Sequence, residues 1–181
     1  MEYTLLNDLT LSTSIADLEE LISNNIPFNF YSPNTEGGLY YYNVSIDLEN
    51  KIKMMLPVPL RNEAAISLCK ILKDVNPHKD HDSKCKINFY IHAGNARTIF
   101  FNDPGVPGYS FHGNEKENIY SVRDHKLKKI SSFIAHDNEA YLLDTSKIHM
   151  VLMPSESSRL IVSVSFDTQY EDVLSILKRN N

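Results

Sequence analysis

The second half of the chain consists of short β-prone runs separated by turns, and this pattern constrains the fold more than any other feature. From residue 86 onward, runs rich in β-branched and aromatic residues recur at fairly even spacing. With two earlier candidates included, we expect strands at 39–46, 51–58, 86–92, 98–101, 119–122, 128–133, 139–143, 148–153 and 160–166. Many short strands of this kind favour a β-sandwich or jelly roll over a βαβ arrangement.

Helices are expected near both ends of the chain. Residues 15–23 carry apolar side chains at helical spacing after Ser14, which is a suitable N-cap, and residues 170–178 are also helix-like. Residues 62–73 are ambiguous, because their apolar positions fit a helical stripe while the second half of the segment fits a strand equally well. The predicted fold class is therefore mainly β, with flanking helices.

The length and composition are those of an ordinary folded domain. At 181 residues, with 42% hydrophobic and 23% charged residues, the chain can bury a continuous core without disulfides or a structural metal. Its net charge of -5 argues against nucleic-acid binding as the main function, because phosphate binding needs clustered Lys and Arg. The basic residues Lys126, Lys128 and Lys129 are interpreted as a solvated face.

The two cysteines, Cys69 and Cys85, indicate neither a disulfide framework nor a zinc ribbon. Both lie among apolar neighbours, so we expect them to be small buried hydrophobes. Residues 1–8 show no signal-peptide pattern, and no run reaches the length of a membrane span. These observations predict a cytoplasmic, reducing location without membrane association.

Three potential metal ligands occur in a fixed order: His78 and Asp80 in one triplet, and His149 further on. Residues two apart in an extended segment project to the same side, so the triplet can direct both side chains at one ion. Two imidazoles and one carboxylate occupy one face of an octahedron and leave three positions open, as a non-haem Fe(II) site requires. The neighbouring His81 and Asp82 compete for the same role, and spacing alone does not exclude them.

Arg159 follows His149 by ten positions and precedes an apolar run. A buried arginine there is costly unless its charge is matched, whereas the alternative is an exposed strand residue. If residues 154–158 form a hairpin, Arg159 lies opposite Leu152, roughly 10 Å along the ladder from His149. That separation suits one ligand with the metal at one end and a guanidinium, which binds carboxylates through two parallel hydrogen bonds, at the other.

This order of residues resembles the Fe(II)- and 2-oxoglutarate-dependent oxygenases. Residues 139–149 look like that family's approach to its distal histidine, and residues 158–166 look like the strand that carries its arginine. The resemblance covers about residues 66–166 and implies a double-stranded β-helix, or jelly roll. We expect one domain over 1–181, with a support region at about 1–60, the β-helix core at about 61–168 and a C-terminal helix at about 169–179.

The resemblance also implies roles for the candidate residues. His78, Asp80 and His149 would hold Fe(II), and Arg159 would bind the distal carboxylate of 2-oxoglutarate. Dioxygen would be the second co-substrate. Hydroxylation of an amino-acid side chain or a small molecule would then release succinate and CO2.

Three further polar residues are candidates for co-substrate contacts. Ser163 shares a strand face with Arg159, and Asn88 and Tyr90 share a face of the strand at 86–92. A solvated strand face is the simpler interpretation of all three. The turn-rich segment 102–126 is the preferred substrate-selecting element, for a small-molecule or peptide substrate.

Two other classes of protein fit the same sequence. A cupin-like barrel would bind another metal through the same side chains without using a keto-acid, and a non-catalytic β-sandwich would carry them as unrelated surface residues. The dense arginine signature of the oxygenases that demethylate nucleic acids is missing after His149, which argues against base repair. No hydrolase motif or phosphate loop occurs. The sequence predicts neither the substrate nor the oligomeric state.

Overall fold

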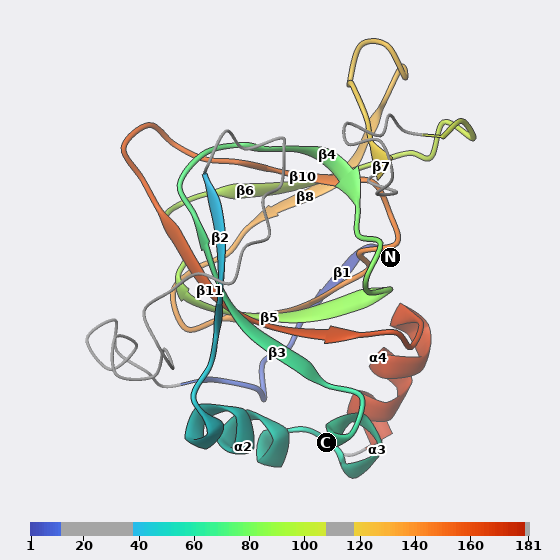
Figure 1. Cartoon of the computed structure of the whole chain (residues 1–181). Coiled ribbons are helices and arrows are strands. Elements are labelled where there is room, and N and C mark those ends of the chain that lie inside the picture. The colour runs from blue at the N-terminus through green and yellow to red at the C-terminus, as the bar shows by residue number, and fades with distance from the viewer. Residues whose placement is uncertain (12–37, 108–117, 180–181) are drawn as a thin grey trace.

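The computed structural model describes residues 1–11, 38–107 and 118–179, in which two antiparallel sheets face each other and three helices lie at the outer side of one of them (Figure 1). Its elements are β1 (Tyr3–Leu5), β2 (Leu39–Asn43), α2 (Ile46–Met55), α3 (Val58–Arg61), β3 (Ala65–Ile71), β4 (Val75–Lys79), β5 (Cys85–His92), β6 (Arg97–Phe101), β7 (Asn118–Ile119), β8 (Lys129–Ile134), β9 (Ala140–Leu143), β10 (His149–Leu152), β11 (Arg159–Phe166) and α4 (Tyr170–Arg179).

The two sheets are formed by strands that alternate between them along the chain. The larger sheet has the order β1-β9-β5-β11-β3-β2, and the smaller sheet has the order β7-β4-β10-β6-β8. From β3 to β6, and again from β8 to β11, each strand lies in the sheet opposite to its predecessor. This is a jelly roll, so the predicted fold class is confirmed.

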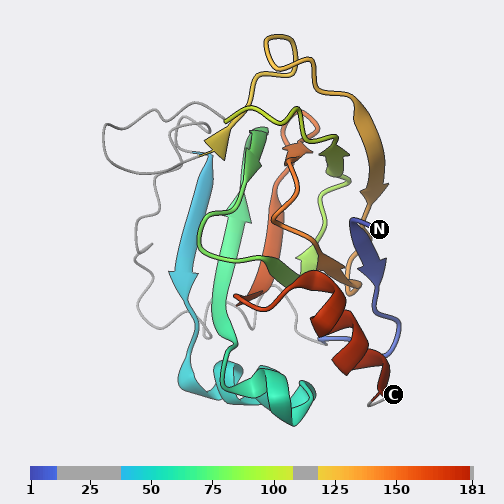
Figure 2. The same ribbon diagram turned by 90° about the vertical axis from the view of Figure 1, so that its right-hand side faces the viewer.

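The larger sheet is covered on both faces. Phe89 of β5 belongs to a core shared with the helices, which lie together at the lower end of the molecule (Figure 2), whereas the adjacent Tyr90 belongs to the core between the sheets. Successive side chains of a strand point to opposite faces, so both layers draw on the same strands. For this reason six of the eight residues of β11 are buried, and these residues lie on both faces of the strand.

The strand expected at residues 51–58 is wrong, because the chain forms α2 and α3 there. The Ser45 hydroxyl accepts a hydrogen bond from the backbone N–H of Leu48 at 3.3 Å and caps the start of α2. Leu48 and Ile52 lie one helical turn apart and are buried, whereas Met54 is 75% exposed. The apolar residues therefore follow the helical period, although the run after residue 51 also alternates as a strand does.

The other predicted strands are confirmed, with ends that shift by one to three residues. The strand at 39–46 ends at Asn43, since Ser45 already caps α2. The ambiguous segment 62–73 contains β3, and the predicted C-terminal helix is α4. The helix expected at 15–23 lies outside the described residues.

The hairpin expected between β10 and β11 is wrong as well. β10 pairs with β4 and β6, whereas β11 pairs with β3 and β5, so the connection at 153–158 crosses from the smaller sheet to the larger one. Arg159 therefore faces His149 and its neighbours across the space between the sheets, not along one ladder.

Two smaller expectations can be compared with the described residues. Cys69 and Cys85 are both buried and unbonded to one another, as predicted. None of the described helices has the length and apolar character needed to cross a membrane.

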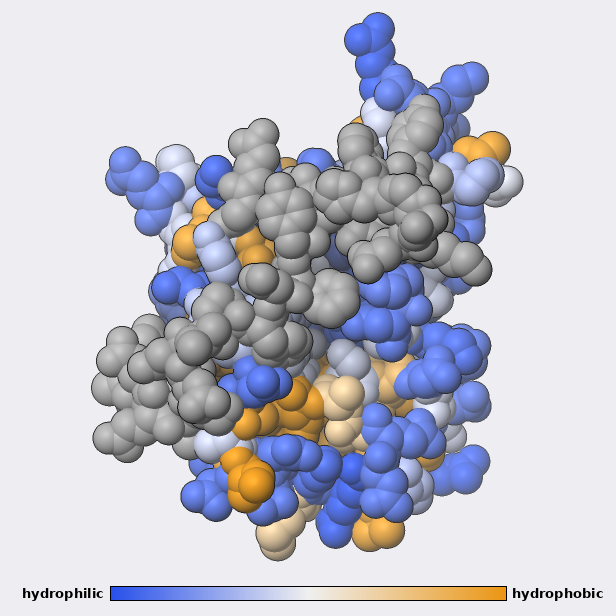
Figure 3. All heavy atoms as spheres, in the orientation of Figure 1, coloured by the Kyte–Doolittle hydropathy of each residue, from blue (hydrophilic) through white to orange (hydrophobic). Residues whose placement is uncertain are grey.

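Truncation of a buried side chain on α2 is expected to destabilise the protein. Ile52 is fully buried, so Ile52→Ala should lower the free energy of unfolding by about 2–5 kcal/mol through lost burial and a residual cavity. Met54→Ala on the same helix is the matched control, because the Met54 side chain is exposed. Figure 3 shows exposed apolar side chains at the lower end of the molecule, where α2 and α3 lie. Urea unfolding measures both, and equal losses would contradict the assigned helix face.

Candidate metal centre

His78, Asp80 and His149 meet at one end of the space between the sheets. His78 lies on β4 and His149 begins β10, and the two residues are direct partners in the antiparallel ladder. Asp80 lies just beyond β4, where its backbone N–H donates to the Thr145 carbonyl at 3.0 Å. Two paired strands and one braced turn therefore position the three side chains.

The donor atoms of these residues are close enough to share one ion. Asp80 Oδ1 lies 3.3 Å from His78 Nε2 and 3.8 Å from His149 Nε2, and one donor atom from each residue lies within 4.8 Å of the others. Adjacent ligands of a metal at ~2.1 Å lie about 3 Å apart, so small side-chain movements would complete the site. Within the described residues this is the one such group of His, Cys, Asp and Glu.

The hydrogen bonds of both imidazoles favour metal binding through Nε2. His78 Nδ1 lies 2.8 Å from the Asn76 carbonyl oxygen, and His149 Nδ1 lies 2.9 Å from the Lys147 carbonyl oxygen. A carbonyl accepts only, so each Nδ1 carries the proton and each Nε2 directs its lone pair at Asp80. Metal-binding histidines are commonly oriented in this way, and the donor set therefore fits a divalent metal.

Asp80 is held as a carboxylate inside the protein. Burial alone would raise its pKa, but the positive charge of the Lys86 ammonium holds the pKa well below its usual range. Lys86 Nζ lies 2.7 Å from Asp80 Oδ2, and both side chains are nearly buried. Burial alone would also lower the pKa of Lys86, but Asp80 raises it, so the pair is ionised.

The alternative ligands His81 and Asp82 are exposed and do not belong to this group of donor atoms. Asp82 Oδ1 accepts a hydrogen bond from Ser83 at 3.3 Å and lies 3.9 Å from Lys86 Nζ. The turn after Asp80 directs both side chains away from the space between the sheets.

Arg159 lines the same cavity as the three donors. The side chain is 1% exposed, and its guanidinium donates to the carbonyl oxygens of Ala93 (3.4 Å) and Ala96 (2.5 Å) and to Thr98 Oγ1 (3.0 Å). Among the described residues, no carboxylate forms an ion pair with it. Burial lowers the pKa of Arg159, yet a guanidinium stays charged, so the cavity holds a cation that no described carboxylate neutralises.

The distance between this cation and the metal donors suits a short diacid. Thr98, which accepts from Arg159, is the ladder partner of Val151 on β10. Val151 lies two positions from His149, or about 7 Å along the strand. Arg159 thus reaches a side chain that lies about 7 Å along the sheet from His149, a spacing on the scale of a short diacid.

The structure places Ser163, Asn88 and Tyr90 on the cavity wall, not on a solvated face. The Ser163 hydroxyl donates to Asn88 Oδ1 at 2.9 Å, which leaves the Asn88 amide N–H groups to serve as donors. The Tyr90 ring lies 5.1 Å from the Arg159 guanidinium carbon in a cation–π contact. Its buried hydroxyl makes no hydrogen bond with another described residue, although Asn88 and Thr98 lie near it.

Sequence analysis missed three residues at this site: Lys86, Thr98 and Gly94. Lys86 shares the strand face of Asn88 and Tyr90. Alternation along the strand therefore already indicated that Lys86 faces the cavity with them. Gly94 has φ +63° and approaches the Ser158 carbonyl so closely that a Cβ would lie 2.0 Å from its oxygen. This close packing fixes the backbone next to Arg159, and nothing local in the sequence indicates it.

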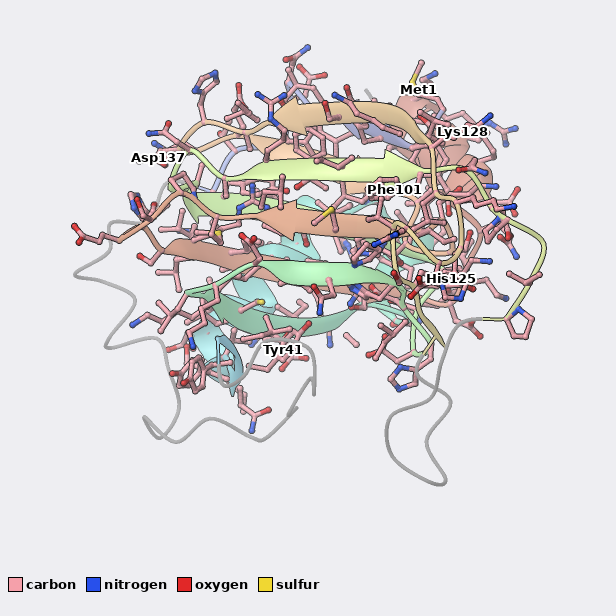
Figure 4. All side chains as sticks on the ribbon, turned by 90° about the horizontal axis from the view of Figure 1, so that it is seen from above. Met1, Tyr41, Phe101, His125, Lys128 and Asp137 are labelled. Atoms are coloured by element: carbon pink, nitrogen blue, oxygen red, sulfur yellow. The ribbon has the colours of Figure 1, made fainter. Side chains whose placement is uncertain are left out.

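The remaining histidines do not join the metal donors. His92, at the end of β5, lies 3.6 Å from Asp137. Seen from above, Asp137 and His125 lie at opposite ends of the molecule (Figure 4). His125 is buried near Ser121, and His136 is exposed. His112 lies outside the described residues, as does much of the segment 102–126, so its predicted role in substrate selection stays a prediction.

Comparisons with known proteins show the fold. No family model matches the sequence, and no curated protein sequence matches it. HygX from Streptomyces hygroscopicus, solved with nickel, 2-oxoglutarate and hygromycin B, is similar at a TM-score of 0.54 and 13% identity, over 90% of this chain and 81% of HygX. SnoK, a non-haem α-ketoglutarate-dependent carbocyclase from nogalamycin biosynthesis, is similar at a TM-score of 0.56 and 10% identity, over 91% of this chain and 79% of SnoK.

Vicilin from Corylus avellana (hazelnut) matches at a TM-score of 0.44 and 11% identity, over 80% of this chain. The chain spans 31% of the length of that vicilin. At these identities, the similarities to HygX and SnoK concern the jelly-roll fold and not the chemistry of the site.

Acid is expected to destabilise the metal-free protein through His149. Burial and the neighbouring His78 lower the pKa of His149 to about 4, whereas an unfolded histidine titrates near 6.5. The unfolded state therefore binds the proton first, and the free energy of unfolding should fall by up to about 3 kcal/mol as the pH drops from about 6.5 to about 4. Urea unfolding with a chelator present measures this loss.

His149→Gln should abolish most of that pH dependence. His136→Gln is the control, because His136 is exposed and should leave the dependence as it is in the wild type. If the free energy of unfolding of His149→Gln falls with pH as steeply as that of the wild type, another group causes the loss of stability in acid.

Proposed function

We propose that this protein is an Fe(II)- and 2-oxoglutarate-dependent dioxygenase that hydroxylates an amino-acid side chain or a small molecule and releases succinate and CO2. The observation that carries the proposal is the buried Arg159, which lacks an anionic partner among the described residues and shares a cavity with two histidines and a carboxylate. A metal alone would not require this cation. A ligand with a metal-binding end and a carboxylate end accounts for both features.

His78, Asp80 and His149 are the residues that would hold the metal. Two imidazoles and one carboxylate with free positions beside them are typical of non-haem Fe(II) sites. When bound, Fe(II) would coordinate the keto-acid and dioxygen side by side, so that dioxygen takes up the electrons released as the keto-acid is oxidatively decarboxylated. The protein holds both imidazoles in the Nδ1–H form and keeps Asp80 ionised.

Arg159 would bind the distal carboxylate of 2-oxoglutarate. Its guanidinium is already fixed by Ala93, Ala96 and Thr98, so little side-chain entropy is lost on binding. Thr98 accepts from Arg159 and thus has its own hydroxyl hydrogen to donate to the same carboxylate. The Arg159 side chain is 1% exposed, and an ion pair formed by a buried guanidinium is stronger than one in water.

Ser163, Asn88 and Tyr90 are proposed to complete the co-substrate pocket. The Asn88 amide, oriented by Ser163, offers N–H donors to the middle of the bound keto-acid. The Tyr90 hydroxyl is a buried group without a hydrogen bond among the described residues, and a carboxylate oxygen would satisfy it. Burial raises the pKa of Tyr90, so the phenol stays protonated and acts as a donor.

The similar folds of HygX and SnoK support this proposal, since one was solved with nickel and 2-oxoglutarate and the other is described as α-ketoglutarate dependent. We further propose a small-molecule or peptide substrate and a cytoplasmic location. The division into a support region, a β-helix core and a C-terminal helix stays a prediction.

Calorimetric titration of 2-oxoglutarate under anaerobic conditions, with and without Mn(II) in place of Fe(II), tests the function. We expect binding that requires the metal and is lost in His149→Ala. Arg159→Met should weaken it by about 100-fold, the effect of two hydrogen bonds to a charged group. Arg97→Met is the matched control, because Arg97 is exposed at the start of β6 and should bind as the wild type does.

Each departure from this result has a distinct meaning. Mn(II) binding without any response to 2-oxoglutarate would contradict the proposal and favour a cupin-like metal enzyme. If the protein binds neither Mn(II) nor 2-oxoglutarate, the remaining interpretation is a non-catalytic β-sandwich. Thermal unfolding of each variant checks that a lost affinity does not reflect a lost fold.

A further inference from the structure

The two oxygens of the Asp80 carboxylate have different partners. Oδ1 faces the imidazoles of His78 and His149, at 3.3 and 3.8 Å from their Nε2 atoms. Oδ2 faces away from them and lies 2.7 Å from Lys86 Nζ. The Ser83 hydroxyl also donates to Oδ2, at 3.5 Å.

Lys86 is placed as part of the cavity and not as a surface cation. It extends from β5, where it pairs with Ser165 of β11 and Leu143 of β9, and its side chain is 12% exposed. Burying an ammonium beside the metal donors is costly unless it forms a specific interaction. Its short contact is with Asp80, while Asp82 lies further away at 3.9 Å.

The denticity of a carboxylate ligand decides how many metal positions stay free. A carboxylate that binds through both oxygens takes a position that a chelating keto-acid or dioxygen needs, whereas a single oxygen leaves three positions open. An ammonium on the second oxygen opposes two-oxygen binding, because it would be moved towards the metal charge or lose its partner.

We propose that Lys86 is a positioning residue that reserves Oδ2 of Asp80, limits this carboxylate to one donor atom, and so keeps a third metal position free. The inference rests on the proposed metal site and deepens it. Among the described residues, the ion pairs of Lys86 are with Asp80 and, at longer range, Asp82, so its close contact with the proposed site is through Asp80. It also compensates the charge of Asp80, which favours binding of an anionic co-substrate.

The test counts the water molecules on Mn(II) without any co-substrate, from the broadening of its electron paramagnetic resonance lines in water enriched in oxygen-17. We expect about three exchangeable waters in the wild type. Lys86→Met, which keeps the length of the side chain but not its charge, should show about two. Lys84→Met is the matched control, because Lys84 is more exposed and pairs with Asp167 outside the cavity, and it should show the wild-type number.

A second measurement uses calorimetry on the same variants. Lys86→Met should bind Mn(II) at least as tightly as the wild type, whereas its metal-dependent affinity for 2-oxoglutarate should fall by about tenfold or more, the effect of one interaction with a charged group. A merely structural role would weaken both affinities together.

Two results would overturn the inference. Two waters on the wild-type Mn(II) would show that Asp80 binds through both oxygens despite Lys86, and this result needs no variant to fold. Three waters in a folded Lys86→Met would show that Lys86 does not control the carboxylate. Failure of 2-oxoglutarate to bind a wild-type site with three waters would overturn the proposed function and leave the role of Lys86 intact.

Discussion

The constraint on which the rest of this structure depends is the burial of charged groups between two sheets. A jelly roll normally fills that space with apolar side chains, and much of it is so filled here, by residues such as Phe100, Val151 and Ile161. Asp80, Lys86 and Arg159 interrupt this layer. Each must be stabilised by specific contacts, because an unpaired charge in such a space is strongly destabilising.

The three charges are stabilised in different ways, and the difference defines the site. Asp80 and Lys86 compensate one another at 2.7 Å. Arg159 has hydrogen bonds to carbonyl and hydroxyl oxygens but no carboxylate among the described residues, so its charge is solvated without being neutralised. The cavity therefore has a metal-binding end and an anion-binding end, and the paired strands β10 and β6 set the distance between them.

Local pattern predicted much of the fold and part of the site. The alternation of apolar and polar residues identified β5. His78 and Asp80, two residues apart, direct their side chains to the same place, as the sequence predicts. The strand predicted at residues 51–58 is wrong, because this segment continues a helix that Ser45 caps and whose buried residues repeat at the helical period. Alternation also failed to separate the buried face of Asn88 and Tyr90 from a solvated one, because polar residues are typical of both.

The sequence by itself determined the kinds of element, their order and the chemical character of the candidate ligands. Only the tertiary structure decided that β10 and β11 lie in opposite sheets, that Lys86 pairs with Asp80, and that Gly94 packs against the backbone beside Arg159. The reason is physical. Periodicity and capping act over a few residues, whereas pairing between strands and the burial of a charge depend on residues tens of positions away along the chain.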